Sequence, residues 1–341
     1  MNTLCRFVRG NFAVGVVMLG LFSGGCMPSD KSVISQADSF HGGIKPAAMS
    51  DPQLAEYIQT IGDRVIAVAK KTQQANDPNS AWMFSKDMQF HLVNSKTLNA
   101  FTTGGEHMYV YNELFQQCKS EDELAAVVAH EFGHIYGRHV QKGMRRQYIT
   151  MGAAAAAGGA GYVAGGKDKG GEYAGSAAAA ALAAGQFVGM SFTRGDEAQA
   201  DQFGFDFYTQ AGWDPNHFGD FFQHMIDLGY DKGTEMLSDH PSLKSRVEVA
   251  KKQAAALPPQ AKDWRRAPVA DANTLKQLQA KAQQVAKTMP DDSSLQNSQK
   301  LLAAMPRSCL TPAIHEDQKK AELAVMADAE QAKQAKQKAQ K

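Results

Sequence analysis

The most constraining feature of this chain is a capped apolar run that carries two histidines. Ser120 and Glu123 have the spacing of a capping box, and apolar residues follow at once. His130 and His134 lie in this run four positions apart, so in a helix they occupy one face, one turn from each other. The pattern predicts a helix that runs from Ser120 through His134 to about His139.

Residues 130–134 read His-Glu-Phe-Gly-His, the HExxH pattern in which two imidazoles can reach one metal ion. Zinc binds histidine nitrogens at about 2.0–2.1 Å, which both side chains can satisfy from one face of a helix. Glu131 lies beside that face, where it can take a proton from water without binding the metal. Apolar neighbours on both sides argue against a helix with two solvated histidines. We therefore predict one Zn²⁺ ion, with His130 and His134 as ligands and Glu131 as the general base.

A zinc site of this kind needs a third protein ligand, and one candidate follows the pattern directly. Some zinc peptidases extend HExxH to HExxHxxGxxH, and Gly137 has the position of that glycine. The third histidine would be residue 140, which is Val140, and His139 is one position short. In a continuous helix His139 would point about 180° away from His130. The spacing therefore excludes His139 as a ligand.

The other candidate is a pair of carboxylates, Glu197 and Asp201, in a segment predicted to be helical from about Asp196 to Gln210. Because they are four residues apart, both face one side of that helix. One carboxylate can bind the metal and leave an open position for water. The other can accept the remaining N–H of a ligating histidine. Charged residues at this spacing are usually solvated, but the upstream HExxH pattern favours a role in the metal site.

The combination of these motifs resembles the M48 peptidases, a group that contains CAAX-prenyl endopeptidases, membrane heat-shock proteases and periplasmic assembly proteases. The resemblance covers roughly residues 50–255. The matching features are Asn99-Ala100-Phe101 with Gly104-Gly105, Glu123 through His139, Glu197 to Asp201, and Asp239-His240-Pro241-Ser242 followed by Arg246.

The resemblance implies an α+β fold, mainly α, of the zincin-like metalloprotease type. It implies a small antiparallel sheet or hairpin, an active-site helix and a second helix that carries a glutamate ligand. Glu197 is then the third zinc ligand, as in gluzincins, and Asp201 supports a ligating histidine. The sequence has no long transmembrane spans, so it looks like the soluble periplasmic branch of the group.

Two further residues near the C-terminal end of the match have two interpretations. The segment Asp239-His240-Pro241-Ser242 can be a turn that caps the next helix through Asp239 or Ser242. The resemblance instead places His240 and Arg246 near the metal. There they could stabilise the oxyanion, or His240 could occupy the open metal position in a closed state.

The substrate-binding region is predicted between two strands. Residues 88–93 and 107–111 are rich in large apolar residues, and a glycine-containing loop at 99–105 separates them. They are predicted to pair as a hairpin. The second strand would form an edge to which an extended substrate adds by main-chain pairing. The predicted substrate-binding residues are Asn99, His107 and Tyr109.

The first 26 residues are typical of a secretory signal. Arg6 and Arg9 precede an apolar stretch at residues 12–22, which is too short to span a bilayer comfortably. Cys26 follows two glycines and resembles the lipidated cysteine of bacterial lipoproteins, although Ser23 replaces the preferred aliphatic residue. A plain cleaved signal and an uncleaved anchor are the alternatives. Without an aspartate after Cys26, we expect a lipoprotein of the outer membrane that faces the periplasm.

The remaining chain divides into a linker at 27–50, a peptidase domain at 51–257 and a helical tail rich in Ala, Gln and Lys at 258–341. Asp51 and Pro52 predict the cap and first turn of a helix. The Ala- and Gly-rich residues 151–190 predict two closely packed helices, with a membrane-touching hairpin or a lid as the alternative. Cys118 and Cys309 could pair in an oxidising compartment, or remain two isolated thiols.

Composition limits the possible partners. The chain has 341 residues, 43% of them hydrophobic, which is ample for a buried core, and a formal net charge of only +1. Such a balance argues against nucleic acid as the main partner. We therefore predict a zinc-dependent endopeptidase that cleaves envelope proteins, such as misfolded or unassembled outer-membrane proteins. The alternative is a zinc-bearing chaperone or assembly factor that works with the envelope assembly machinery and has latent proteolysis.

Overall fold

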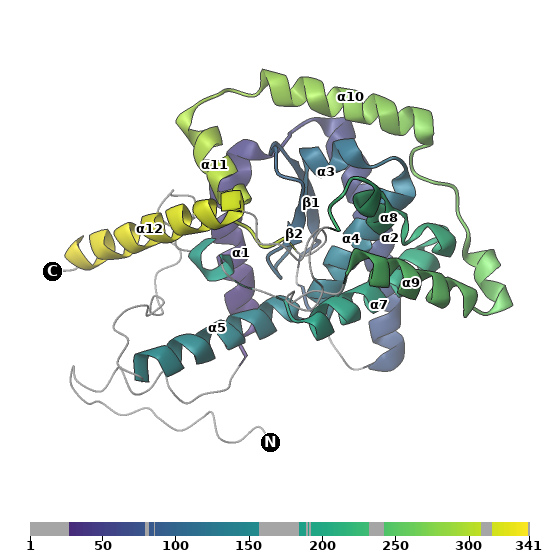
Figure 1. The fold of residues 1–341 in the computed structure, drawn as a ribbon, viewed down its shortest axis with the longest axis horizontal. Helices are drawn as coiled ribbons and strands as arrows, with labels where there is room; N and C mark the ends of the chain where they lie inside the picture. Colours follow the sequence, from purple (N-terminus) through teal and green to yellow (C-terminus); the bar gives the residue numbers. More distant parts are fainter. Residues whose placement is uncertain are drawn as a thin grey trace.

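The computed structural model describes residues 27–78, 82–84, 86–156, 184–188, 190, 192–231, 242–307 and 316–339. These residues form a mostly helical fold around a small sheet (Figure 1), which confirms the predicted α+β, mainly α, class. The elements in chain order are α1 (Asp30–Ile44), η1 (Lys45–Ala47), α2 (Pro52–Asn76), β1 (Gln89–Val93), β2 (Ala100–Thr102), β3 (His107–Tyr111), α3 (Asn112–Gln117), α4 (Glu121–Tyr136), α5 (His139–Ala156), α7 (Arg194–Ala211), η2 (Pro215–His217), α8 (Asp220–Asp227), α9 (Leu243–Ala255), η4 (Pro259–Trp264), α10 (Ala272–Thr288), α11 (Ser293–Ala303) and α12 (Glu316–Ala339).

The sheet is mixed, and its strand order is β1-β3-β2. β1 pairs with β3 in parallel, so the predicted hairpin between these two strands is wrong. The hairpin is instead formed by β2 and β3, because residues predicted as loop form β2 and pair antiparallel with β3. Gly104 makes the turn between them with a φ of 72°, a value that favours glycine. Consequently β3 is the central strand, and it has no free edge for a substrate.

The two faces of the sheet belong to two apolar clusters. Phe90, Met108 and Val110 point into the cluster that contains the buried residues of α2 and α4. Phe101 and Tyr109 point to the other face, into a cluster with buried residues of α1, α5 and α11. The alternation follows from the two-residue period of a strand. Because both faces are covered, all five residues of β3 are buried.

Helix α2 begins as the sequence predicts. The carboxylate of Asp51 accepts hydrogen bonds from the backbone N–H groups of Gln53 and Leu54, and Pro52 occupies the first turn. Its apolar face is buried against β1 and α4. This long helix is therefore one wall of the core that holds the active-site helix in place.

The segment predicted as a linker contains helix α1. Ser29 caps it by accepting a hydrogen bond from the N–H of Ser32. Four apolar residues at helical spacing form its buried face, and polar residues occupy the rest, which explains the polar appearance of the segment. The buried residues are Val33, Ala37, Phe40 and Ile44.

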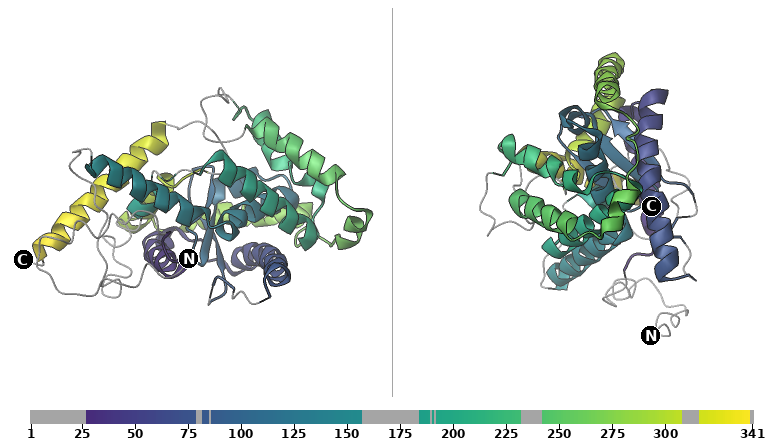
Figure 2. Two further views of the ribbon diagram at one scale, coloured as in Figure 1. Left: turned by 90° about the horizontal axis from the view of Figure 1, so that it is seen from below. Right: turned by 90° about the vertical axis from the view of Figure 1, so that its right-hand side faces the viewer.

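The predicted tail is helical, and its helices pack against the rest of the fold. Leu275 and Ala282 of α10 join the cluster of α2 and α4. The hydroxyl of Ser298 in α11 donates to the carbonyl of Gly43 at 2.8 Å, which ties α11 to the end of α1. α12 lies beside α11 and projects at one end of the molecule (Figure 1 and Figure 2). The division between domain and tail stays a prediction.

Several predictions fall on residues outside those described. These include Cys26, Cys309 and His240, and most of the Ala- and Gly-rich segment, at 157–183. Cys118 is buried and carries a free thiol. Within the described ranges, no helix combines the length and the apolar character that a membrane span requires.

Candidate metal centre and active site

Helix α4 carries the HExxH residues and is almost entirely buried. The hydroxyl of Ser120 accepts the N–H of Glu123 at 3.2 Å, and the carboxylate of Glu123 accepts the N–H of Lys119 at 2.8 Å. This pair of bonds is close to the predicted capping box. The helix ends at Tyr136, three residues before the predicted end, and Arg138 then adopts a φ of 52°.

Helix α7 lies against α4 at backbone distance. A Cβ added to Gly133 would meet the carbonyl oxygen of Ala200 at 2.5 Å, and one added to Gly204 would meet Cα of His130 at 3.0 Å. The contact leaves room only for glycine at position 133, and a side chain at position 204 would press on the backbone of His130. Because the two backbones touch, Glu197 on α7 reaches the imidazoles of α4.

His130, His134 and Glu197 converge on one point and are all fully buried. The two Nε2 atoms lie 3.1 Å apart, and the Glu197 oxygens lie 3.6 and 3.7 Å from them. Tetrahedral zinc with bonds of 2.0–2.1 Å would separate its ligand atoms by about 3.3–3.4 Å. The three side chains therefore lie close to the spacing of a tetrahedral site.

The hydrogen bonds behind the histidines explain why both Nε2 atoms face inward. Nδ1 of His130 lies 2.8 Å from Oδ1 of Asp201, which can only accept, so this nitrogen carries the proton. Nδ1 of His134 lies 3.0 Å from Nδ1 of His139, whose Nε2 lies 2.9 Å from the Gln199 side-chain oxygen. A proton on Nε2 of His139 therefore leaves its Nδ1 free to accept from His134. Two Nε2 lone pairs 3.1 Å apart, beside a buried carboxylate, fit a divalent cation.

Arg246 holds Asp201 in place. Its Nε and Nη2 atoms donate to the two carboxylate oxygens at 2.8 and 2.6 Å. Burial alone would raise the pKa of Asp201, but Arg246 and His130 outweigh it and hold the pKa at about 2. The Arg246 guanidinium lies 3.9 Å from the ring centre of Phe222, which fixes its plane. Arg246 thus lies near the metal residues, as the resemblance implies, but it is occupied with Asp201.

Glu131 occupies the position next to the first ligand and is fully buried. Its charge is one of the causes that raise the pKa of Tyr111, after burial. Phe192 stacks on the ring of His134 with centres 4.1 Å apart. Glu131 is therefore a buried carboxylate on the same helix as His130 and His134.

The prediction that His139 points away from the site is wrong, because its ring contacts that of His134. It assumed a continuous helix, whereas α4 ends and α5 begins at His139 itself. A Cβ at Gly137 would meet the His139 ring at 2.4 Å, so glycine there lets the ring fold back towards His134. His139 is not one of the three converging residues, but its Nδ1 contacts Nδ1 of His134, which is one of them. The glycine and the following arginine were the available signal for this break.

The predicted substrate-binding residues do not lie together at the metal. Asn99 is fully buried, and its amide donates to the carbonyl of Pro306 at 3.1 Å. Tyr109 is fully buried, and His107 faces other histidines on the α1 side of the sheet. The assumption of an edge strand behind His107 and Tyr109 is wrong, because β3 is central, and substrate binding by these residues stays a prediction.

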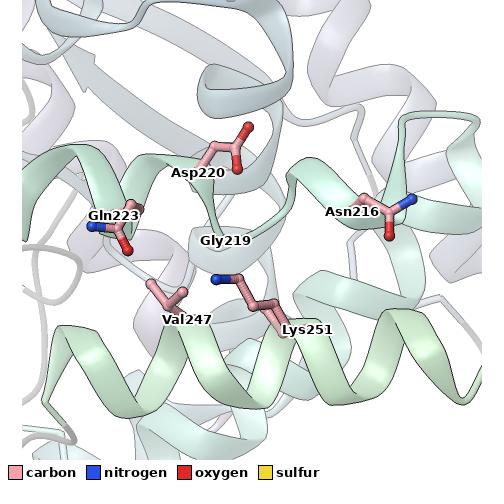
Figure 3. Close-up of a pocket in the computed structure, with 7 residues that line it drawn as sticks. Asn216, Gly219, Asp220, Gln223, Val247 and Lys251 are labelled. Carbon is pink, nitrogen blue, oxygen red and sulfur yellow. The ribbon is translucent and has the colours of Figure 1, made fainter.

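Two further observations concern α9. Ser242 caps it by accepting the N–H of Ser245, as the turn interpretation predicts, while His240 lies outside the described residues. A small pocket separates α9 from η2 and α8 (Figure 3). It is lined by residues such as Asp220 and Lys251, and none of the predicted site residues lines it.

Comparison with known proteins agrees with this geometry. The sequence model of Peptidase family M48 matches residues 52–254. The beta-barrel assembly-enhancing protease of Yersinia pestis is 31% identical over 226 residues, which cover 61% of this chain and 40% of that protein.

More distant relatives share the same region. Metalloprotease LoiP of Escherichia coli (strain K12) is 26% identical over 169 residues, or 50% of this chain and 64% of that protein. Mitochondrial metalloendopeptidase OMA1 of Arabidopsis thaliana is 25% identical over 228 residues, or 65% of this chain and 42% of that protein. The chain therefore spans less than two thirds of the length of each of these relatives.

Proposed function

This chain belongs to peptidase family M48, and from that premise we propose that it is a zinc-dependent endopeptidase. The observation that carries the proposal is the convergence of His130, His134 and Glu197 at the ligand spacing of tetrahedral zinc. Zinc suits a set of imidazoles and a carboxylate, and three protein ligands leave one position for chemistry.

Each residue then has a defined task in the reaction. Bound zinc would polarise the scissile carbonyl and lower the pKa of the attacking water. Glu131 accepts the proton of that water and delivers it to the leaving amine. Asp201 holds His130 in its ligating tautomer, and Arg246 holds Asp201. We assign Arg246 a positioning role, and oxyanion stabilisation by His240 stays a prediction.

The substrate class is proposed from the relatives. The names of two of them describe proteases that enhance β-barrel assembly. We propose that this chain cleaves misfolded or unassembled outer-membrane proteins in the periplasm, tethered to the outer membrane through a lipid on Cys26. Secretion and lipidation are supported by the sequence of the first 26 residues.

The decisive experiment replaces Glu131 by Gln, which keeps the size of the side chain and removes the base. We expect the rate of casein hydrolysis to fall at least about 100-fold, because positioned acid–base groups contribute on that scale. Zinc content, measured by mass spectrometry of the metal, should not change. Glu56→Gln makes the same chemical change on the exposed side of α2 and should keep full activity. Undiminished hydrolysis by a clean preparation of the Glu131 variant would overturn the assignment.

A second function, assistance in assembly without hydrolysis, is favoured by the helices α10–α12, which follow the end of the family match. Complementation separates the two functions. If the Glu131→Gln protein fully restores envelope integrity in cells that lack the wild-type protein, binding is the main role. If it restores none, hydrolysis is required.

A further inference from the structure

Three histidines meet on the α1 side of the sheet, whereas the HExxH helix packs against the other face. His41 comes from α1, His91 from β1 and His107 from β3. One nitrogen of each ring lies within 4.8 Å of the nitrogens of the other two. The catalytic residues have no part in this group, and the proposed reaction does not use it.

The parallel pairing of β1 and β3 brings two of these rings together. Gln89 is opposite His107, and His91 is opposite Tyr109, so His91 and His107 are diagonal neighbours on one face. On α1, Asp38 and His41 are three residues apart and face the same side. The group is therefore built by two paired strands and by α1, which packs against the same face of the sheet.

The contacts of each ring show which nitrogen is directed at its neighbours. Nε2 of His91 lies 3.0 Å from Nδ1 of His107. Nε2 of His107 lies 3.5 Å from Oδ1 of Asp38. Nδ1 of His41 lies 3.2 Å from the hydroxyl of Tyr109, and its ring stacks on that of His107 with centres 4.0 Å apart. Asp38 thus lies beside the His107 nitrogen that does not face His91, at a longer distance than Asp201 has from His130, and a carboxylate there can orient a metal-binding histidine.

The charge state of the group suits metal binding. Burial, followed by the neighbouring His107 and Lys45, lowers the pKa of His41 to about 4. Burial also lowers the pKa of His91 to about 3 and that of His107 to about 4. The rings are therefore neutral at pH 7, and each has a lone pair. Neutral imidazole is the form that ligates zinc, copper and nickel.

We propose that His41, His91 and His107 form a second metal site, for a divalent ion of the imidazole-preferring class (Zn²⁺, Cu²⁺ or Ni²⁺), with Asp38 orienting His107. His91 and His107 already have the separation of two ligands of one ion. His41 lies on the more open side and closes the site by a side-chain rotation. In the metal-free protein the hydrogen bond between His91 and His107 takes the place of the ion.

The ion would fasten α1 to the sheet. α1 precedes residues 52–254, which match the family, and it follows the segment with the predicted lipid attachment. Its first residue, Asp30, accepts two hydrogen bonds from Arg138, at 3.2 and 3.0 Å, in the turn between α4 and α5. A metal bound by His41 would therefore hold α1 more firmly, and with it the contact of Asp30 with the turn that follows α4.

The test counts metal ions per chain in the full-length mature protein, dialysed against Zn²⁺ and analysed by mass spectrometry of the metal. The wild type should hold two equivalents. His91→Gln and His41→Gln should each hold one, and His217→Gln, which changes an exposed histidine, should hold two. His134→Gln should also hold one, and the remaining ion should disappear in the His91/His134 double variant.

The outcomes distinguish the two metal sites. The inference rests on the proposed zinc peptidase only in that the expected total of two ions includes the catalytic zinc. A single equivalent that only His134→Gln removes would overturn the second site and leave the peptidase intact. Zinc that His134→Gln does not affect, but His91→Gln removes, would contradict the peptidase site alone. Cu²⁺ paramagnetic resonance in the His134→Gln background gives an independent readout, because the nitrogen coupling that remains there should weaken when His41→Gln is added. An unchanged copper spectrum in that double variant would overturn the proposal even if His91→Gln does not fold.

Discussion

The two histidine groups of this protein differ in what surrounds them. The group of His130, His134 and Glu197 is fully buried, and a chain of charged and polar side chains supports it from behind. The group of His41, His91 and His107 is only partly buried, and among the described residues its ion pair is with Asp38. The difference shows how burial determines the amount of support that a polar site needs.

The physical reason is the cost of removing charge from water. A divalent ion in a dry site is tolerated when carboxylates lie beside it, and Glu197 and Asp201 are the buried carboxylates here. Asp201 in turn is balanced by Arg246, so the charges alternate along the chain of contacts. The partly exposed group needs no such chain, because water screens it and its rings are neutral.

The largest effect should follow from breaking the buried ion pair. Arg246→Met keeps much of the side-chain volume against Phe222 but leaves Asp201 buried without its cation. Removal of one partner of a buried pair costs about 3–5 kcal/mol, so the free energy of unfolding in urea should fall by that amount. Zinc affinity at the catalytic site should fall about 10- to 100-fold, as for other residues that orient ligands.

The matched control is Lys244→Met, which removes the same charge from an exposed position on α9. A surface change of this kind should stay within about 0.5 kcal/mol. If Arg246→Met and Lys244→Met unfold at the same urea concentration, the ion pair does not stabilise the fold. The proposed difference in support between the two histidine groups is then wrong. The second histidine group should bind its ion equally well in both variants.

A smaller effect is expected from His139, which contacts the proposed ligand His134. His139→Leu removes the acceptor for Nδ1 of His134 and the contact with Gln199. Zinc should bind about 10-fold more weakly, because His134 loses the contact that fixes its tautomer. Competition with a coloured chelator measures this directly. His139→Gln, which can still accept a hydrogen bond, should recover part of the affinity. Equal affinity of the wild type and the Leu variant would show that His139 only fills space.

The convergence of residues at the proposed catalytic site was largely predictable from sequence, because the residues of each helix are close in the chain. His130, Glu131 and His134 lie within five positions, and the helical period alone places them on adjoining faces. Glu197 and Asp201 follow the same rule on a second helix. What the sequence could not show is the direct contact of the two helix backbones, which depends on Gly133 and Gly204 meeting residues 67 or more positions away.

The errors all concern pairings that local patterns do not determine. Alternating residues predicted strands at 88–93 and 107–111, but not that they run in parallel with a third strand beside them. That error hid the meeting of His91 with His107, since an antiparallel register pairs different residues. The helix break after Gly137 was missed because a glycine near a helix end is compatible with either continuation or a stop. In each case tertiary contacts decided between local alternatives.

The smallest effect should come from Asp38, and it sharpens the comparison most. Asp38→Asn removes the charge near His107 and keeps an oxygen that can accept its N–H. The Asp38 side chain is 47% exposed, so its loss should change folding stability by no more than about 1 kcal/mol. Metal affinity of the second group should fall only a few-fold, and the catalytic zinc should not respond. Asp63→Asn on the exposed side of α2 is the matched control. If Asp38→Asn reduces metal affinity at its own group as much as Arg246→Met does at the catalytic site, the group of His41, His91 and His107 also depends on a charged residue beside it. Surface water would then not be a substitute for that residue.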